Sequence, residues 1–195
     1  MVPALFLVLA AIAYRLLTGL LIHSGASWLS NFAPMAALAL CCAVYFPPKL
    51  KFSVPLAGLF ISDLILNYRY GATLLDGHIV SRYLALVLVG AAGIALQSRA
   101  SLKMLLPASI GASTFFYLIT CAFSWLSDPG YSKNFAGLIQ AITVGLPDYG
   151  ATPAWMFLRN SLVGDLFFTL VFVMCMSFSR SADVSRAKTA LPHTA

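Results

Sequence analysis

The sequence predicts an all-α membrane protein, a bundle of six transmembrane helices, and two observations lead to this class. Hydrophobic residues make up 61% of the 195 residues and charged residues only 9%, with a mean hydropathy of +0.89. A soluble fold of this size could not cover itself with polar surface at that composition. The apolar residues also form long blocks, and most of the charges lie between them or after them.

Each apolar block comes close to the length of a membrane-crossing helix, which is about 20 residues with a range of roughly 17–25. The predicted spans are residues 2–22, 29–46, 50–67, 79–96, 104–126 and 154–178. They are too long and too evenly apolar for the alternating strands of a membrane barrel. We therefore expect residues 1–178 to form a single integral membrane domain.

Two further segments lie outside the spans. Residues 135–146, FAGLIQAITVGL, are apolar but too short to cross, so they predict a helix that lies at the interface or re-enters the membrane to cap a cavity. Such a cap is a candidate lid, with residues 149–152 as a flexible turn. Residues 179–195 are polar and basic and predict a disordered tail.

The basic residues sort by loop. Lysine and arginine occur between spans two and three, between spans four and five, and in the tail: Lys49, Lys51, Arg99, Lys103, Arg180, Arg186 and Lys188. The positive-inside rule places these loops and both termini in the cytoplasm. The predicted location is therefore a cytoplasmic membrane. The net charge of +6 is not gathered into one stripe, so it does not point to nucleic acid.

Charged residues inside the predicted spans are the strongest chemical signal, because a charge in hydrocarbon costs several kcal/mol and normally faces a bundle interior or a cavity. Depth estimates place Asp63, Arg82 and Arg159 in an outer polar layer. Arg15 and Asp165 are expected deeper, as a second layer joined by an ion pair. We favour a structural role for that pair, whereas ligand contact and structural support both remain open for the outer three.

Aromatic residues gather at the predicted outer side, which suggests an external pocket for a small molecule, although an interfacial aromatic belt explains part of the pattern. Together with the outer charges and two further polar residues, they give the predicted substrate-binding set: Asp63, Arg82, Arg159, Tyr83, Trp28, Phe32, Tyr68, Tyr131, Asn160 and His78.

Motifs for catalysis or metal binding are not evident. All four cysteines fall inside predicted spans, without C-x-x-C or Cys/His ligand spacing, and the sequence contains neither H-E-x-x-H nor G-x-S-x-G. We expect no enzyme activity, no metal and no cofactor. A membrane enzyme remains the competing class, in which Asp63 and Asp165 would form a dyad if they lay at one depth. A structural or assembly subunit of a larger membrane complex is the third.

Four elements carry a resemblance to a known family. They are the run NFAPMAALAL at residues 31–40, the SDL at 62–64, the segment from Tyr131 through Leu138, and FLRNSLVGDL at residues 157–166. With these, the chain resembles a bacterial family of small six-span membrane proteins of unassigned function. That family is itself similar to the substrate-binding S components of energy-coupling-factor (ECF) vitamin transporters.

The resemblance implies a protein that binds a vitamin or related micronutrient from outside and passes it inward, with cobalamin or another corrinoid as a candidate. The first span lacks the A-x-x-x-A element by which many S components dock on their energising partner. Both an ECF-type energising module and a solitary transporter are therefore open.

Overall fold

The computed structural model describes residues 2–23, 32–71, 78–147 and 152–190, with the backbone alone described at residues 2, 23 and 180–190. These ranges contain helices and no strands, so the all-α prediction is confirmed for them. The helices are α1 (Val2–His23), α2 (Met35–Tyr45), α3 (Ser53–Tyr70), α4 (His78–Leu96), α5 (Leu102–Ser127), α6 (Phe135–Thr143) and α7 (Ala154–Ala190), and a 3₁₀ turn, Gln97–Arg99, follows α4.

Among the described residues, four helices are long and apolar enough to cross a membrane: Pro3–Ile22 within α1, His78–Arg99 including the 3₁₀ turn, Leu102–Ser127, and Ala154–Ser179 within α7. The chain therefore has the helices of a membrane protein. The predicted count of six spans is not confirmed, because neither α2 nor α3 belongs to this group.

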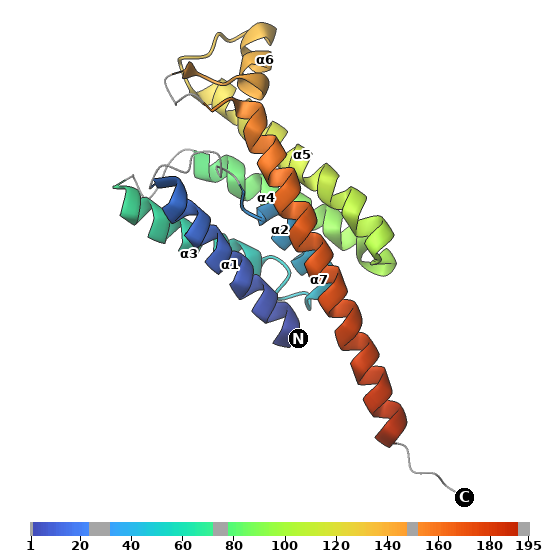
Figure 1. Cartoon of the computed structure of the whole chain (residues 1–195). Coiled ribbons are helices and arrows are strands. Elements are labelled where there is room, and N and C mark those ends of the chain that lie inside the picture. Colours follow the sequence, from blue (N-terminus) through green and yellow to red (C-terminus); the bar gives the residue numbers. More distant parts are fainter. Residues whose placement is uncertain (1, 24–31, 72–77, 148–151, 191–195) are drawn as a thin grey trace, which may run out of the picture.

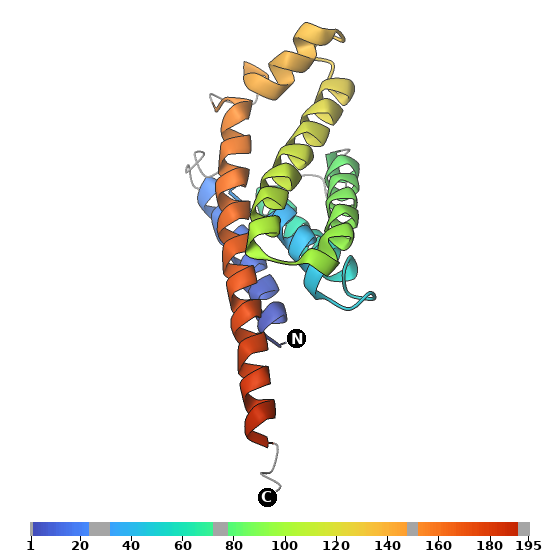
Figure 2. The same ribbon diagram turned by 90° about the vertical axis from the view of Figure 1, so that its right-hand side faces the viewer.

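Helix α2 lies at the centre of the bundle, where it packs against α3, α4, α5 and α7 (Figures 1 and 2). Every residue from Met35 to Val44 is buried. At 11 residues α2 is about 16 Å long, roughly half the thickness of a bilayer core. The predicted full-length span at 29–46 is thus wrong, because the chain is not helical at 32–34 and Pro47 and Pro48 follow the other end.

Helix α7 is much longer than the expected sixth span. It runs on as far as Ala190, so the predicted disorder after residue 178 is wrong up to that point (Figure 1). Residues 179–190 contain several good helix formers and neither glycine nor proline, which explains the continuation. The rest of the predicted tail, 191–195, lies outside the described residues.

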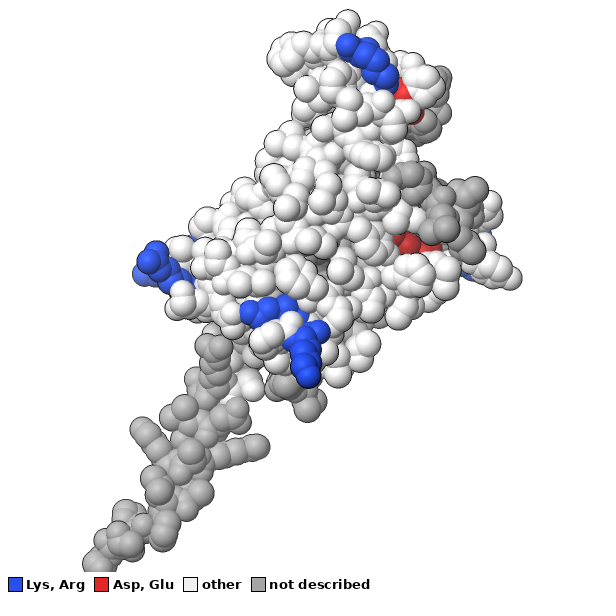
Figure 3. Space-filling model, turned by 180° about the vertical axis from the view of Figure 1, so that it is seen from behind, with Lys and Arg blue, Asp and Glu red and all other residues white. Residues whose placement is uncertain are grey.

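The two ends of the molecule differ. The Lys51 ammonium donates a hydrogen bond to Oε1 of Gln97 (2.5 Å), which joins the basic α2–α3 loop to the turn after α4. Helix α6 closes the opposite end, where it bridges α5 and α7 (Figure 2). Figure 3 shows basic groups near both ends of one face and a broad area without lysine or arginine between them.

Candidate functional site

Three charged side chains from three helices meet inside the bundle. Nη2 of Arg15 on α1 lies 2.5 Å from Oδ1 of Asp63 on α3, and Nη2 of Arg82 on α4 lies 3.5 Å from Oδ2 of the same carboxylate. Asp63 is almost fully buried, Arg15 is 14% exposed and Arg82 30% exposed at the side chain. One carboxylate thus serves two guanidinium groups.

Close packing of α1 on α3 brings Arg15 to Asp63. A Cβ at Gly19 would lie 2.6 Å from the side chain of Leu66, and one at Gly58 would lie 2.6 Å from that of Ile12. A side chain at either position would have to displace the end of a side chain on the facing helix, so the two glycines let α1 and α3 pack closely. Tyr70 adds a hydrogen bond from its hydroxyl to the carbonyl of Gly19 (2.6 Å).

A cavity of about 310 Å³ lies beside the charged group, and we call it the central cavity. Arg15, Arg82 and Asp165 contribute its charged walls. The remaining walls are mostly apolar and include Leu59 and Phe116. Its volume falls at the lower end of the range for small-molecule sites, about 300–1,000 Å³.

A second cavity, of about 570 Å³, lies under α6, and we call it the α6 cavity. It is the more polar of the two, with His78, Thr120 and Tyr131 among its walls. Arg82 and Phe116 line both cavities and therefore stand between them. A solute passing from one cavity to the other would meet the Arg82 guanidinium.

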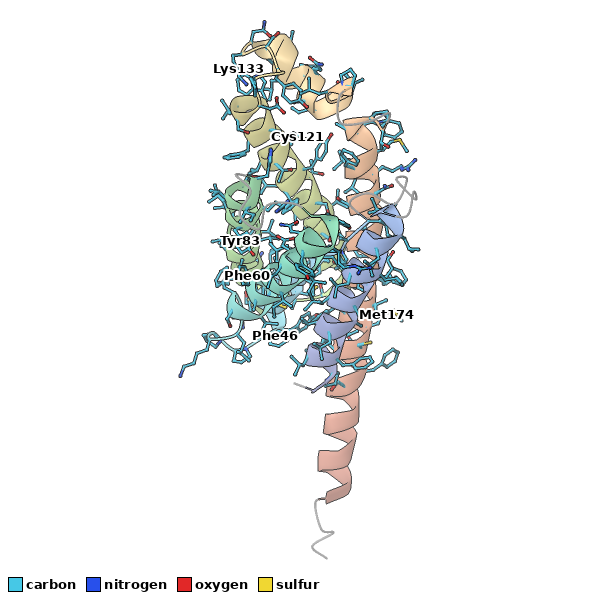
Figure 4. The ribbon with its side chains drawn as sticks, turned by 90° about the vertical axis from the view of Figure 1, so that its left-hand side faces the viewer. Phe46, Phe60, Tyr83, Cys121, Lys133 and Met174 are labelled. Carbon is cyan, nitrogen blue, oxygen red and sulfur yellow. The ribbon has the colours of Figure 1, made fainter. Side chains whose placement is uncertain are left out.

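Helix α6 is fastened over its cavity by side-chain contacts from α5. The Tyr117 hydroxyl donates to the carbonyl of Ile142 (2.6 Å), and Nε1 of Trp125 donates to the carbonyl of Ser132 (2.9 Å). Figure 4 shows Cys121, one of the cavity walls, below Lys133, which lies at the α6 end of the molecule. The segment 135–146, predicted as a short helix, contains α6.

Burial raises the pKa of the Tyr131 phenol above its ordinary value, so this wall of the α6 cavity keeps its hydroxyl proton at neutral pH.

Close sets of three or more His, Cys, Asp or Glu side chains, which a metal would need, do not occur within the described ranges.

Asp165 on α7 does not pair with Arg15, and the predicted ion pair is wrong. Its Oδ2 accepts a hydrogen bond from the Ser113 hydroxyl (2.6 Å), and its Oδ1 accepts one from the backbone N–H of Ala37 (2.8 Å). The carboxylate therefore caps the N-terminus of α2, where Pro34 supplies no side-chain cap. Arg15 is instead held by Asp63.

Comparison with family models gives a match over residues 1–187, to a family of unknown function designated DUF6580. The chain belongs to the DUF6580 family. Neither the curated proteins nor the solved structures gave a match.

In this DUF6580 chain, two of the motifs quoted from the sequence meet at the start of α2. A Cβ at Gly164 would lie 3.8 Å from backbone atoms of Phe32 and Ala33, and the next residue, Asp165, caps α2. The motif pair at 31–40 and 157–166 therefore fixes where the short central helix begins.

Sequence reasoning found part of the DUF6580 site. Asp63 and Arg82 meet as expected, Phe32 lines the central cavity, and His78 and Tyr131 line the α6 cavity. Tyr83 is partly buried against the core.

Three predicted residues lie elsewhere, and a fourth is not described. Arg159 is exposed, with its guanidinium 5.7 Å from the Trp155 ring centroid, and it does not join Asp63 and Arg82 as the predicted outer layer requires. Asn160 is buried and accepts hydrogen bonds from Arg159. Tyr68 is 81% exposed. Trp28 lies outside the described residues.

Residues that sequence reasoning missed include Phe116 and Ser113. Phe116 lies with Arg82 between the two cavities. In the sequence, nothing distinguishes it from any other packing residue of an apolar span. Ser113 had a weak signal, since a hydroxyl in a membrane span often bonds across helices.

Proposed function

We propose that this protein is a membrane transport protein that binds a small solute in the central cavity and carries it across the bilayer. The observation that supports it most is that Arg15 and Arg82, the two arginines paired with Asp63, both lie in the wall of a cavity. Intramembrane charges that face a cavity commonly mark a substrate path.

The short helix α2 supports the same proposal. Irregular backbone at membrane depth is tolerated where it is buried in protein or lines a cavity, and transporters often build their sites at such broken helices. Phe32 and Ala33, which precede α2 in non-helical conformation, both line the central cavity. The start of α2 thus has the surroundings of a binding site.

The α6 cavity fits the role of an antechamber. It meets the central cavity at Arg82 and Phe116, and α6 covers it. Movement of α6 would admit a solute, and Arg82 would then be the first charged group of the central site that it reaches. We propose α6 as the lid of the transporter.

The solute that we propose is a vitamin or a related micronutrient, taken up through a bacterial inner membrane with both termini in the cytoplasm. The sequence motifs that resemble a family similar to the S components of ECF transporters motivate this choice, with an energising module or a solitary mode both open. The central cavity, at about 310 Å³, favours a compact solute over a corrinoid. The basic loops joined by Lys51 and Gln97 would face the cytoplasm.

Uptake by the source cells tests this function. The spent medium of a deletion strain would be compared by untargeted mass spectrometry with that of strains carrying wild-type, Arg82→Gln or Arg159→Ala protein. Transport predicts a solute that wild-type and Arg159→Ala cells remove and the other two strains leave behind. Identical media from all four strains would contradict it, provided that the three strains carrying the protein contain equal amounts of it.

A further inference from the structure

The charges around the central cavity do not balance within the Arg15–Asp63–Arg82 group. Two guanidinium groups carry two positive charges, and Asp63 supplies one negative charge. Burial makes an uncompensated charge costly, so such a group normally has a partner. The group therefore has the electrostatics of an anion site.

The remaining acidic wall does not supply that partner. Asp165 lines the central cavity, but its two oxygens accept hydrogen bonds from Ser113 and from the backbone of Ala37. Its charge faces the N-terminus of α2, where the helix dipole is positive. Neither arginine forms an ion pair with it in the described part of the chain.

Both guanidinium groups also have donors to spare. A guanidinium carries five N–H donors, and each arginine reaches Asp63 through Nη2 alone. Nε of Arg15 and Nε of Arg82 are buried, and neither has a hydrogen-bond partner among the residues that the structure describes. A buried donor without an acceptor is unfavourable. An acceptor with two oxygens would use these donors.

We infer that the solute is a compact monocarboxylate whose carboxylate binds Arg82 and Arg15, with an apolar body against the Leu59 and Phe116 side of the central cavity. This inference rests on the proposed function and names its substrate class. A single excess positive charge matches a monoanion better than a phosphate dianion. The planar fork of a guanidinium fits a carboxylate.

Asp63 then has a second role, as the internal carboxylate that holds both arginines before the solute arrives. The Arg82 contact, at 3.5 Å, is the looser of the two and involves the more exposed arginine. Arg82 is therefore the arginine that turns toward an incoming solute, while Arg15 stays with Asp63. An incoming carboxylate competes with Asp63 for Arg82.

Matched acid and amide pairs test the inference. Benzoate with benzamide, nicotinate with nicotinamide, and 3-phenylpropionate with its amide differ within each pair in charge and little in shape. Their binding to protein in lipid nanodiscs would be measured as the shift of the thermal unfolding midpoint with concentration, at constant ionic strength and neutral pH. We expect at least one acid to raise the midpoint and its amide to leave it unchanged.

Two variants should then change the binding of that acid in opposite directions. Arg82→Gln should weaken binding of that acid about tenfold or more, because a charge-assisted hydrogen bond is lost. Asp63→Asn should strengthen it, because the competing carboxylate is gone. A merely structural role predicts weaker binding in both. Arg99→Gln, an exposed arginine at the turn after α4, is the matched control and should change nothing.

The outcomes separate the two proposals. Three outcomes would each overturn the monocarboxylate. The acids could leave the unfolding midpoint unchanged, or the amides could bind as well as the acids. The third is that Asp63→Asn weakens binding of the acid as much as Arg82→Gln does. A neutral amide that binds in an Arg82-independent way would overturn it too, yet leave a solute-binding transporter standing. A phosphate ester preferred over every acid would replace the substrate class.

Discussion

Asp165 of α7 accepts a hydrogen bond from the backbone N–H of Ala37, at 2.8 Å and across 128 positions of sequence. This contact lets a helix begin inside the bundle, because the carboxylate satisfies one of its first N–H groups. The start of α2 and the wall of the central cavity are therefore set by one carboxylate.

Replacement of Asp165 by alanine should destabilise the protein. The N–H of Ala37 would lose its acceptor while buried, at a cost of about 1–3 kcal/mol, whereas the Ser113 hydroxyl could still donate to the carbonyl of Ser109 (2.9 Å). Ser113→Ala removes one hydrogen bond and leaves the cap in place, so it should cost about 1 kcal/mol. Denaturation in mixed micelles measures both. A larger loss in Ser113→Ala than in Asp165→Ala would show that the cap is not what holds α2.

The sequence could predict that Asp63 and Arg82 meet, but it assigned Arg15 to the wrong carboxylate. Helix α3 ends at Tyr70, three residues beyond the predicted end at 67, so Asp63 lies deeper than expected. Arg15 precedes His23 by eight residues and Asp63 precedes Tyr70 by seven, which puts them about 12 Å and 11 Å from their helix ends. An error of a few residues in a predicted helix end is therefore enough to change which ion pair is predicted.

Hydropathy predicted the long helices well, because α1, α4, α5 and the Ala154–Ser179 part of α7 are predominantly apolar. It failed at α2, where the flanking apolar residues 32–34 look like helix but are not. A signal was present: Pro34 is followed by a buried helix without its own capping side chain, and such a helix needs an acceptor from elsewhere. Which helix provides that acceptor depends on which helices pack against the start of α2, and hydropathy does not carry this information.

The pair Arg15 and Asp63 should show strong coupling. Asp63→Leu leaves two guanidinium groups near the cavity without a carboxylate, and breaking a buried pair in this way costs about 3–5 kcal/mol. The double variant Arg15→Leu with Asp63→Leu should recover part of that loss, because one unpaired charge is removed. A double-mutant cycle on unfolding free energies measures the coupling. Additive losses would contradict the ion pair.

Gly137 should be intolerant of any side chain. A Cβ there would lie 1.9 Å from the carbonyl oxygen of Ser132, so Gly137→Ala must displace the backbone at the start of α6. Gly111→Ala on α5 is the matched control, since nothing lies within 4 Å of its Cβ position. We expect Gly137→Ala to lower the thermal midpoint. Gly111→Ala should keep or raise it, because alanine stabilises a helix over glycine by up to about 1 kcal/mol. Equal midpoints would contradict the packing of α6.

Cysteine labelling should report the closure of α6. Cys121 lines the α6 cavity and is partly exposed, whereas Cys41 and Cys42 are fully buried. Removing the indole donor in Trp125→Phe deletes the hydrogen bond to Ser132, just before α6, so maleimide should modify Cys121 faster in that variant. Cys175 on α7 should react at an unchanged rate. Peptide mass spectrometry gives the rates, and faster labelling at Cys175 as well would point to general loosening.

Retention of a solute at Arg82 is the decisive property of the central cavity, and native mass spectrometry of protein purified from its own host measures it. Wild-type protein should carry an additional mass of one small organic solute. Arg159→Ala, whose arginine lies at the surface, should carry it too. Arg82→Gln should lose it while remaining folded. Wild-type protein without bound mass, or Arg82→Gln with the same occupancy as wild type, would contradict a solute site at the central cavity.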